Sequence, residues 1–357
     1  MSVVFVIFGL NSYSGAALQA MKLAEELVKI EVNIKIINIE NSTTKSSFDG
    51  NVEQVIINGN IFRRIILAVK LFRQLEERLI HLHGFNSVLI LGALITGKKI
   101  VLKTTLDGED DFDSLAKKKL WFFYRPLISR ISANVTLTQK TLRKNIKYIT
   151  KSRIYKIPNG VKLNASNFQK TNNKFCSVGV VCERKGTLDV IKYFNDNYAK
   201  LDGSELLIVG PNDESFSEFD SIYYQKCMNF ILENQLGEKV KFLGKRNQNE
   251  VYQIYSDCLA LIFCSKREGL PNVLIEAMSH NCIPISTEIG GVVFEIIEDQ
   301  KTGFILSNLS RRITIDEILK VQRSNHCINH IKDNFCLSDI SKTYKTIYKS
   351  ILTIEKK

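Results

Sequence analysis

Two acidic residues eight positions apart, Glu268 and Glu276, lie in the stretch "SKREGLPNVLIEAMSHNCIPI" of residues 265–285. Apolar runs lie on both sides of the stretch that holds the two acids, which is unusual for solvated surface charges. Glu268 follows a strand-like apolar run, and Gly269 after it permits close approach of a ligand to the backbone. Glu276 lies one turn beyond Asn272 on the same face of a predicted helix. Carboxylates in these two places can accept hydrogen bonds from the hydroxyls of a polyhydroxy ligand.

The start of that helix offers a second kind of contact. Pro271 suits a first helical turn, where its missing N–H has no consequence. The first N–H groups of the helix have no partner within the helix, and the positive end of the helix dipole attracts phosphate or sugar oxygens. On spacing alone, two structural caps or ion-pair partners remain an alternative for the two acids.

Charge is distributed unevenly along the 357 residues, whose net charge is +12. Residues 1–165 hold 25 Lys and Arg against 13 Asp and Glu, and the remaining residues hold 24 of each. This excess predicts an anionic partner: nucleic acid, phospholipid or a phosphorylated substrate. A solvated basic face without a specific partner is the alternative.

Residues 116–130, "AKKKLWFFYRPLISR", lie within this basic half and combine lysines with aromatic residues. The predicted contacts of this segment are Lys117, Lys118, Lys119, Trp121, Phe122 and Arg125. Such a segment suits the interface of an anionic membrane. It equally suits a helix with buried aromatic residues and solvated lysines. Nucleic acid is disfavoured, since no recognisable binding module accompanies the charge.

Length and composition indicate an ordinary globular protein with two domains, since 45% of the residues are hydrophobic and 24% are charged. The start "MSVVFVIFGL" predicts a first strand and not a signal peptide. No apolar run reaches the roughly 20 residues that a membrane span needs. The eight cysteines form no C-x2-C or C-x4-C pair, which favours buried, reduced thiols over disulfides or a metal site.

Short β-branched runs alternate with amphipathic stretches, which predicts an α/β protein with parallel sheets. Helices are predicted over 17–30 and 62–80 in the first half and over 186–201, 222–237 and 272–280 in the second, with a closing helix over 338–352. Strands are predicted over 3–9, 32–39, 87–95, 99–106, 133–138 and 153–161, and then over 174–181, 205–210, 239–244, 259–264 and 282–287. The alternation restarts after a Pro, Gly and Asn-rich join at 157–174, which predicts two doubly wound domains facing a ligand cleft.

The segment "EGLPNVLIEAMSHNCIPISTEIGGVVFEIIEDQKTGFIL" of residues 268–306 closely resembles the donor-binding segment of retaining glycosyltransferases of family four, which have the GT-B architecture. The resemblance extends to "RKG" at 184–186, "LLIVGP" at 206–211, "KFLGKR" at 241–246 and "IPNGV" at 157–161. In the first half, "SGAALQAMKLAEEL" and "IHLHG" match more loosely.

The resemblance implies two Rossmann-like domains: residues 1–165 for the acceptor, residues 166–337 for a nucleotide sugar, and a closing helix over 338–357 that returns to the first domain. Glu276 then corresponds to the acid that holds the ribose and Glu268 to the acid at the donor sugar. Lys185, with Arg184 beside it, corresponds to the lysine that neutralises the diphosphate. The further implied donor contacts are Gly15, Gly269, Leu270, Pro271, Asn272 and Val273.

Two positions depart from the family pattern. Val180 follows Gly179 where the family often has arginine, so Arg184 is the predicted second positive charge. Where the family often has a histidine facing the acceptor, "VLKTTLDG" places Asp107, the predicted second catalytic residue. Asp111 and Asp113 form a D-x-D, which in the other glycosyltransferase fold holds manganese, but the doubled βαβ series favours an acidic turn or helix cap.

The sequence therefore predicts a retaining enzyme that transfers a sugar from a UDP- or GDP-linked donor to a glycan acceptor, lipid-linked, in capsule or lipopolysaccharide O-antigen biosynthesis. The enzyme is expected at the cytoplasmic face of the plasma membrane, with an anionic membrane surface as partner and without metal, cofactor or nucleic acid. A nucleotide-sugar epimerase of the same fold and a nucleic-acid-binding protein are the alternatives.

Overall fold

The computed structural model describes residues 1–10, 15–40, 52–163, 170–216 and 218–353. The chain divides into an N-terminal unit, Met1–Gly160 with Leu337–Lys357, and a C-terminal unit, Val161–Cys336. The predicted domain join at residues 165 and 166 lies outside the described residues.

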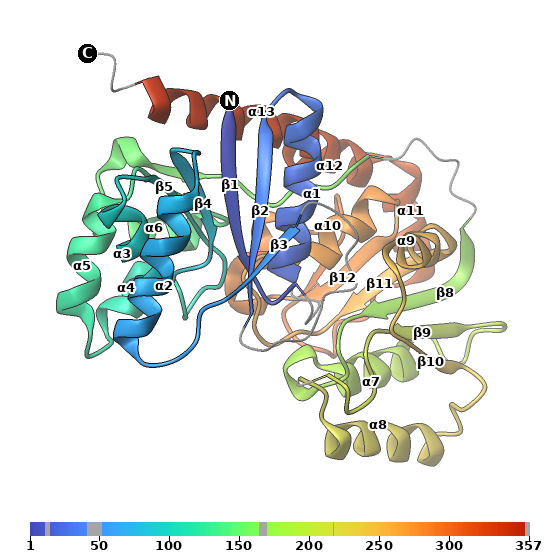
Figure 1. The fold of residues 1–357 in the computed structure, drawn as a ribbon. Coiled ribbons are helices and arrows are strands. Elements are labelled where there is room, and N and C mark those ends of the chain that lie inside the picture. Colours follow the sequence, from blue (N-terminus) through green and yellow to red (C-terminus); the bar gives the residue numbers. More distant parts are fainter. Residues whose placement is uncertain (11–14, 41–51, 164–169, 217, 354–357) are drawn as a thin grey trace. The chain divides into compact units, whose positions relative to one another are not determined.

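The N-terminal unit contains a parallel sheet in the order β3-β2-β1-β4-β5-β6-β7 (Figure 1). Its strands are β1 (Ser2–Phe8), β2 (Asn33–Glu40), β3 (Val52–Ile56), β4 (Leu79–His83), β5 (Lys99–Thr104), β6 (Ala133–Thr136) and β7 (Ile154–Lys156). Its helices are α1 (Gly15–Lys29), α2 (Ile61–Gln74), α3 (Ser87–Ile95), α4 (Phe112–Ala116), α5 (Trp121–Arg130), α6 (Gln139–Asn145) and α13 (Leu337–Thr353).

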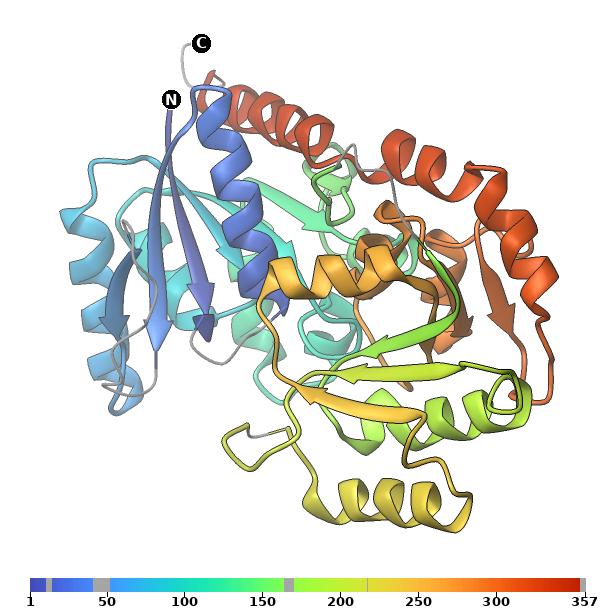
Figure 2. The ribbon, with the colours of Figure 1, turned by 90° about the vertical axis from the view of Figure 1, so that its right-hand side faces the viewer.

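Each face of this sheet has its own apolar core. On one face, side chains of α2, α3 and α5 pack on the strands. On the other face, α1 and α13 supply the helical side of the core, and the two helices run next to each other (Figure 2). The prediction that the C-terminal helix returns to the N-terminal domain is therefore confirmed.

The C-terminal unit contains a second parallel sheet, in the order β10-β9-β8-β11-β12-β13. Its strands are β8 (Thr171–Val178), β9 (Glu205–Val209), β10 (Val240–Gly244), β11 (Cys258–Phe263), β12 (Ile283–Thr287) and β13 (Phe304–Leu306). Its helices are α7 (Thr187–Asn197), α8 (Ser221–Glu233), α9 (Gln248–Asp257), α10 (Asn272–Ser279), α11 (Ile315–Arg323) and α12 (His326–Phe335). Two parallel sheets with flanking helices confirm the predicted α/β class.

Two secondary-structure predictions for the first half are wrong. The run 87–95, predicted as a strand, forms α3, because the Asn86 side chain accepts hydrogen bonds from the N–H groups of Val88 and Leu89 at 3.1 Å and caps a helix. A Cβ at Gly92 would lie 2.8 Å from Ala68 Cβ, so glycine permits the close packing of α3 on α2. The predicted helix 62–80 is divided, since α2 ends at Gln74 and β4 begins at Leu79. In a short run of apolar residues, polar and apolar positions do not alternate, so periodicity cannot distinguish a helix from a strand.

All eight cysteines are free thiols, as predicted, and all but the half-buried Cys336 are buried. Among the described residues, no helix combines the length and the apolar character that crossing a bilayer requires.

A cluster of buried basic groups lies between the N-terminal sheet and α13. Lys103 and His83 are neighbours on β5 and β4, and Lys103 Nζ donates a hydrogen bond to Asn159 Oδ1 at 2.7 Å. Two residues before His83 on β4, the ring nitrogen Nδ1 of His81 forms a hydrogen bond of 2.7 Å with the hydroxyl of Tyr348 on α13. Burial lowers the pKa of Lys103 to about 7, and burial followed by the charge of Lys103 lowers the pKa of His81. His81 is therefore uncharged at neutral pH and Lys103 keeps its proton only in part, at a cost in folding free energy.

Lys103→Met tests this cost. In the unfolded chain the lysine keeps its proton up to about pH 10.4, whereas in the folded chain it loses the proton above about pH 7. The wild-type free energy of unfolding should therefore rise, relative to that of the variant, by about 1.4 kcal/mol per pH unit between these values. Urea unfolding of both proteins at about pH 7.5 and about pH 9.5 measures this difference. Lys349→Met, on the exposed side of α13, is the control and should show no such slope.

Candidate functional site

Two loops of the C-terminal unit meet because the strands that precede them are neighbours. β8 and β11 pair in parallel, so the segments after Val178 and Phe263 leave the same edge of the sheet. The N–H of Lys266 donates to the carbonyl of Arg184 at 2.8 Å and joins the two segments. Gly186 has φ +67°, and a Cβ there would lie 2.2 Å from the carbonyl oxygen of Cys264. Only glycine allows the two backbones to come this close.

This contact brings a lysine and a carboxylate together. Lys185 Nζ lies 2.6 Å from Glu268 Oε1, and Ser265 Oγ donates to the same oxygen at 2.7 Å. The guanidinium of Arg184 lies 3.6 Å from Glu268 Oε1, but its closer partner is Glu218 at 2.7 Å. Lys185 Nζ also lies 5.9 Å from the centre of the Phe263 ring. The structure thus unites the predicted residues Arg184, Lys185 and Glu268 at one edge of the sheet.

Glycines at the ends of β8 and β9 make room for Lys185. A Cβ at Gly210 would lie 2.0 Å from the carbonyl oxygen of Gly179, so the two strand ends touch through backbone atoms. The side chain of Lys185 passes over Gly179, whose hypothetical Cβ would lie 3.3 Å from Lys185 Cδ. The glycines of the motifs "SVGVV" and "LLIVGP" therefore form the backbone surface on which the side chain of Lys185 packs.

The second acid lies on α10. Glu276 is only 8% exposed, and its carbonyl oxygen accepts hydrogen bonds from Ser279 Oγ at 2.7 Å and lies 2.9 Å from His280 Nδ1. Burial, and then the charge of Glu276, raise the pKa of Tyr255 well above its usual value, which keeps this phenol protonated. α10 begins at Asn272, with Pro271 in extended conformation as the residue before it and not inside the first turn.

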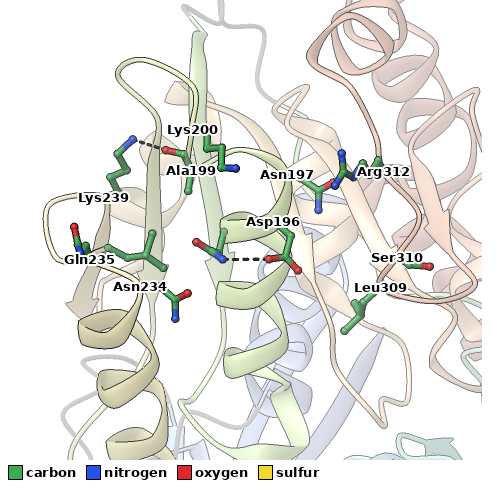
Figure 3. A pocket seen from close by; sticks show the side chains of 12 residues that line it. Asp196, Asn197, Ala199, Lys200, Asn234, Gln235, Lys239, Leu309, Ser310 and Arg312 are labelled. Atoms are coloured by element: carbon green, nitrogen blue, oxygen red, sulfur yellow. Dashed lines mark hydrogen bonds between the residues drawn. The ribbon is translucent and has the colours of Figure 1, made fainter.

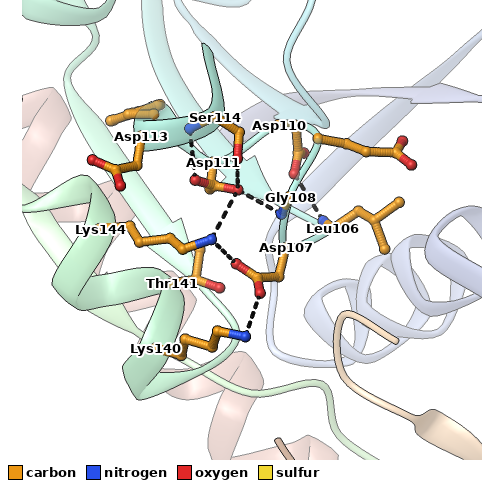
Figure 4. A network of polar contacts seen from close by, with 12 residues as sticks. Leu106, Asp107, Gly108, Asp110, Asp111, Asp113, Ser114, Lys140, Thr141 and Lys144 are labelled. Atoms are coloured by element: carbon orange, nitrogen blue, oxygen red, sulfur yellow. Dashed lines mark hydrogen bonds and ion pairs between the residues drawn. The ribbon is translucent and has the colours of Figure 1, made fainter. Parts of the chain in front are cut away.

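The predicted contributions of the N-terminal unit lie at the carboxyl edge of its sheet. Gly15 is the first residue of α1, after the undescribed residues 11–14. Asp107 follows β5 and forms ion pairs with Lys140 and Lys144 of α6 (Figure 4). Burial raises the pKa of Asp107, but the hydrogen bonds from the two lysines outweigh it and hold the pKa below its usual value. Asp107 is therefore a weak base, and its catalytic contact with the acceptor stays a prediction.

The D-x-D motif has structural partners. Asp111 caps α4 by accepting the N–H of Ser114 at 2.9 Å, and Asp113 pairs with Lys147 at 3.1 Å and with the Tyr148 hydroxyl at 3.0 Å. The interpretation of this motif as an acidic helix cap is confirmed. In the part of the chain that the structure describes, no three His, Cys, Asp or Glu side chains are grouped as metal ligands.

The basic aromatic segment, residues 116–130, contains the last residue of α4, the turn after it and the whole of α5. Lys117, Lys118, Lys119 and Arg125 are exposed, as predicted. Phe122 is 77% exposed, whereas Trp121 packs edge-to-face on Tyr148 at 5.0 Å and on the core beneath the helix. Trp121 is half-buried, so its contact with a membrane or an acceptor stays a prediction.

Sequence reasoning missed two residues of the Lys185 and Glu268 cluster. Ser265 precedes Glu268 by three positions in "SKREG", a spacing that places its hydroxyl within reach of the acid only in the folded loop. Glu218 comes from the loop after β9, and nothing in the sequence links it to Arg184. The contact of Glu218 with Arg184 joins segments far apart in the chain and therefore leaves no local pattern.

A cavity of about 660 Å³ lies at the other edge of the C-terminal sheet (Figure 3). It is lined by Asn195, Asp196, Asn197, Ala199, Lys200, Asn234, Gln235, Leu236, Lys239, Leu309, Ser310 and Arg312. Lys239 Nζ donates to the carbonyl of Ala199, just beyond α7, as a cation at a helix C-terminus commonly does. None of the predicted site residues lines this cavity, so the chemistry of the Lys185 and Glu268 cluster, and not cavity volume, identifies the candidate site.

Solved structures share this fold along the whole chain. Anabaena HepE, crystallised with UDP and glucose, superposes with a TM-score of 0.72 at 16% identity over 98% of this chain and 100% of that one. A glycosyltransferase from Rickettsia africae superposes with a TM-score of 0.74 at 18% identity over 99% of both chains. The architecture is therefore that of the GT-B glycosyltransferases.

Sequence comparison adds a similarity to a family of enzymes and to individual relatives. Residues 161–326 match the model of the glycosyl transferases group 1. The capsular polysaccharide biosynthesis glycosyltransferase CapH of Staphylococcus aureus is 25% identical over 301 residues, 79% of each chain. An uncharacterized glycosyltransferase of Methanocaldococcus jannaschii, MJ1178, is 26% identical over 323 residues, 86% of this chain and 84% of that one. The chain is therefore similar to the glycosyl transferases group 1 over residues 161–326, and to named glycosyltransferases over 79–86% of its length.

Gly186→Ala should be strongly destabilising for two reasons. Alanine disfavours the left-handed backbone of this position, and its Cβ would clash with the Cys264 carbonyl. Gly203→Ala is the matched control, since Gly203 has φ +63° but open space around the position of a Cβ. The control should lose roughly 1–2 kcal/mol, and Gly186→Ala at least about 2 kcal/mol more. Urea unfolding of both variants measures the two losses, and equal losses would contradict the close contact of the loops.

Proposed function

We propose that the protein is a retaining glycosyltransferase that moves a sugar from a UDP- or GDP-linked donor to a hydroxyl of a lipid-linked glycan in capsule or lipopolysaccharide O-antigen biosynthesis. The ion pair of Lys185 and Glu268 at the carboxyl edge of β8 and β11 carries this proposal. Ligands of open parallel sheets collect at this edge. A cation next to an acid suits a ligand with a diphosphate on one side and sugar hydroxyls on the other.

Each charged group has a separate task in this proposal. Lys185 and Arg184 stabilise the negative charge that develops on the departing diphosphate, and the N-terminus of α10 with the amides of 270–273 adds a positive dipole. Glu268 accepts a hydroxyl of the donor sugar, and Glu276 accepts the ribose hydroxyls. Because fixed cations neutralise the leaving group, we propose that the step requires no metal.

Retention follows from the side of attack. In the proposed reaction the acceptor hydroxyl approaches the face of the sugar from which the diphosphate departs. The bond from the anomeric carbon to the diphosphate oxygen breaks, the bond to the acceptor oxygen forms, and the acceptor proton passes to the departing phosphate. The known ligands of a structural neighbour, UDP and glucose in HepE, are compatible with such a donor.

A membrane-bound acceptor would account for the exposed apolar groups of the N-terminal unit. Phe122 of α5 and Phe62 of α2 are 77% and 76% exposed, and both lie in the first turn of their helices. α2 follows β3 directly and so begins, near Phe62, at the carboxyl edge of the sheet, while Phe122 lies at the start of the helix that leads from α4 to β6. Next to Phe122, Lys117, Lys118 and Lys119 add positive charge. We propose that these groups contact the anionic cytoplasmic face of the plasma membrane.

Donor binding is tested by a thermal-shift panel of UDP- and GDP-sugars, in which only ligands of the folded protein raise the melting temperature. Glu276→Gln keeps the shape of the side chain but removes the charge that accepts ribose hydroxyls. Its affinity for the best donor, measured by calorimetry, should fall by about 10- to 100-fold. Glu233→Ala, on the exposed side of α8, should bind as the wild type does. Unchanged affinity in Glu276→Gln would contradict the assignment, and donor turnover without acceptor would indicate an epimerase.

Membrane contact is tested by flotation with vesicles of phosphatidylcholine alone or mixed with phosphatidylglycerol. Wild-type protein should bind the mixed vesicles and dissociate as salt increases. Replacing Lys117, Lys118 and Lys119 by Gln should weaken binding by about 1 kcal/mol per lysine. The same change at Lys151, Lys200 and Lys349, which are exposed elsewhere on the chain, serves as the charge-matched control. Equal losses in the two triple variants would argue against a specific membrane surface.

A further inference from the structure

Two groups donate hydrogen bonds to the oxygen Oε1 of Glu268. In the proposed function, only one of them keeps this hydrogen bond when a diphosphate binds. Lys185 Nζ lies 2.6 Å and Ser265 Oγ 2.7 Å from this oxygen. In the proposed function Lys185 neutralises the diphosphate. A diphosphate carries more negative charge than a carboxylate, so it competes with Glu268 for the ammonium group.

Arg184 is poorly placed to replace Lys185 at the carboxylate. Its closest approach to Glu268 is 3.6 Å, longer than a hydrogen bond. Its guanidinium already pairs with Glu218 at 2.7 Å and donates to the carbonyl of Arg267 at 3.3 Å. When Lys185 turns to the diphosphate, the hydroxyl of Ser265 is therefore the close donor that remains.

Ser265 is itself held firmly. The residue is 1% exposed, and its hydroxyl has three oxygens in reach: Glu268 Oε1 at 2.7 Å, the Arg184 carbonyl at 3.2 Å and the Arg267 carbonyl at 3.5 Å. A serine has a single proton to donate, and the nearest and charged acceptor takes it. Ser265 thus lies on the loop that carries the acid, and its hydroxyl also reaches the Arg184 carbonyl next to the lysine on the other loop.

We propose that Ser265 is a positioning residue that keeps Glu268 aligned on the donor sugar once Lys185 has exchanged this carboxylate for the diphosphate. This inference rests on the proposed function. It gives the loop after β11 a task that the ion pair alone cannot perform, because the ion pair holds Glu268 only while the diphosphate site is empty.

A comparison of two ligands separates this role from a merely structural one. UDP engages Lys185 but offers no sugar to Glu268, whereas UDP-glucose needs both, and GDP with GDP-mannose is the equivalent pair if the wild type prefers guanine. Ser265→Ala should bind the nucleoside diphosphate within about twofold of the wild type and the nucleotide sugar about tenfold more weakly. Ser265→Thr, which keeps the hydroxyl, should restore most of the difference. Ser204→Ala, a buried serine before β9, should change neither affinity.

A double-mutant cycle completes the test. If Ser265 acts through Glu268, adding Ser265→Ala to Glu268→Ala should cause no further loss of nucleotide-sugar affinity. A further loss, or an equal fall in the affinities for both ligands in Ser265→Ala, would overturn the inference. Melting temperatures of all variants show that the folded protein is being compared. If the wild type bound no nucleotide sugar, the proposed function and this inference would both be wrong. If the wild type bound it normally and Ser265→Ala left the ratio of the affinities for nucleoside diphosphate and nucleotide sugar unchanged, only this inference would be wrong.

Discussion

The close backbone contact between Gly186 and Cys264 governs the candidate site. It requires a left-handed residue without a Cβ, and it brings the segments after β8 and β11 close enough for the Lys266 N–H to bond the Arg184 carbonyl. The Lys185 and Glu268 pair depends on this contact, since the two residues lie on different segments. A larger residue at position 186 would separate the cation from the acid even if every charged side chain were kept.

The same pair explains how the cluster at the carboxyl edge can be stable. An unpaired ammonium group in a partly buried position is costly, and Glu268 compensates the charge of Lys185. The N-terminal unit tolerates the opposite arrangement, since Lys103 is buried beside an amide and not an acid, and its pKa falls to about 7. The two units thus deal with buried lysines in different ways: one by an ion pair, the other by loss of the proton.

The likeness to solved glycosyltransferases reaches along the whole chain at 16–18% identity for HepE and the Rickettsia africae enzyme, which shows how little of the sequence the architecture requires. Fold alone does not identify a substrate. The proposed nucleotide-sugar donor therefore depends on the cluster at the carboxyl edge, and the proposed membrane acceptor depends on exposed Phe62 and Phe122. These are features of this chain and not of the architecture.

The sequence by itself determined the class of the fold, the strands of the second half and the residue types at the carboxyl edge. Period and local motifs carry that information, because they record which face of an element is buried. Only the tertiary structure decided that 87–95 is a helix, that Trp121 points to the core, and that Ser265 shares an oxygen of Glu268 with Lys185. For Trp121 and Ser265 the deciding contacts join segments far apart in the chain, and the packing of α3 on Ala68 of α2 adds such a contact to the local cap by Asn86. Local periodicity has no information about these contacts, and close packing selects among conformations that the sequence allows.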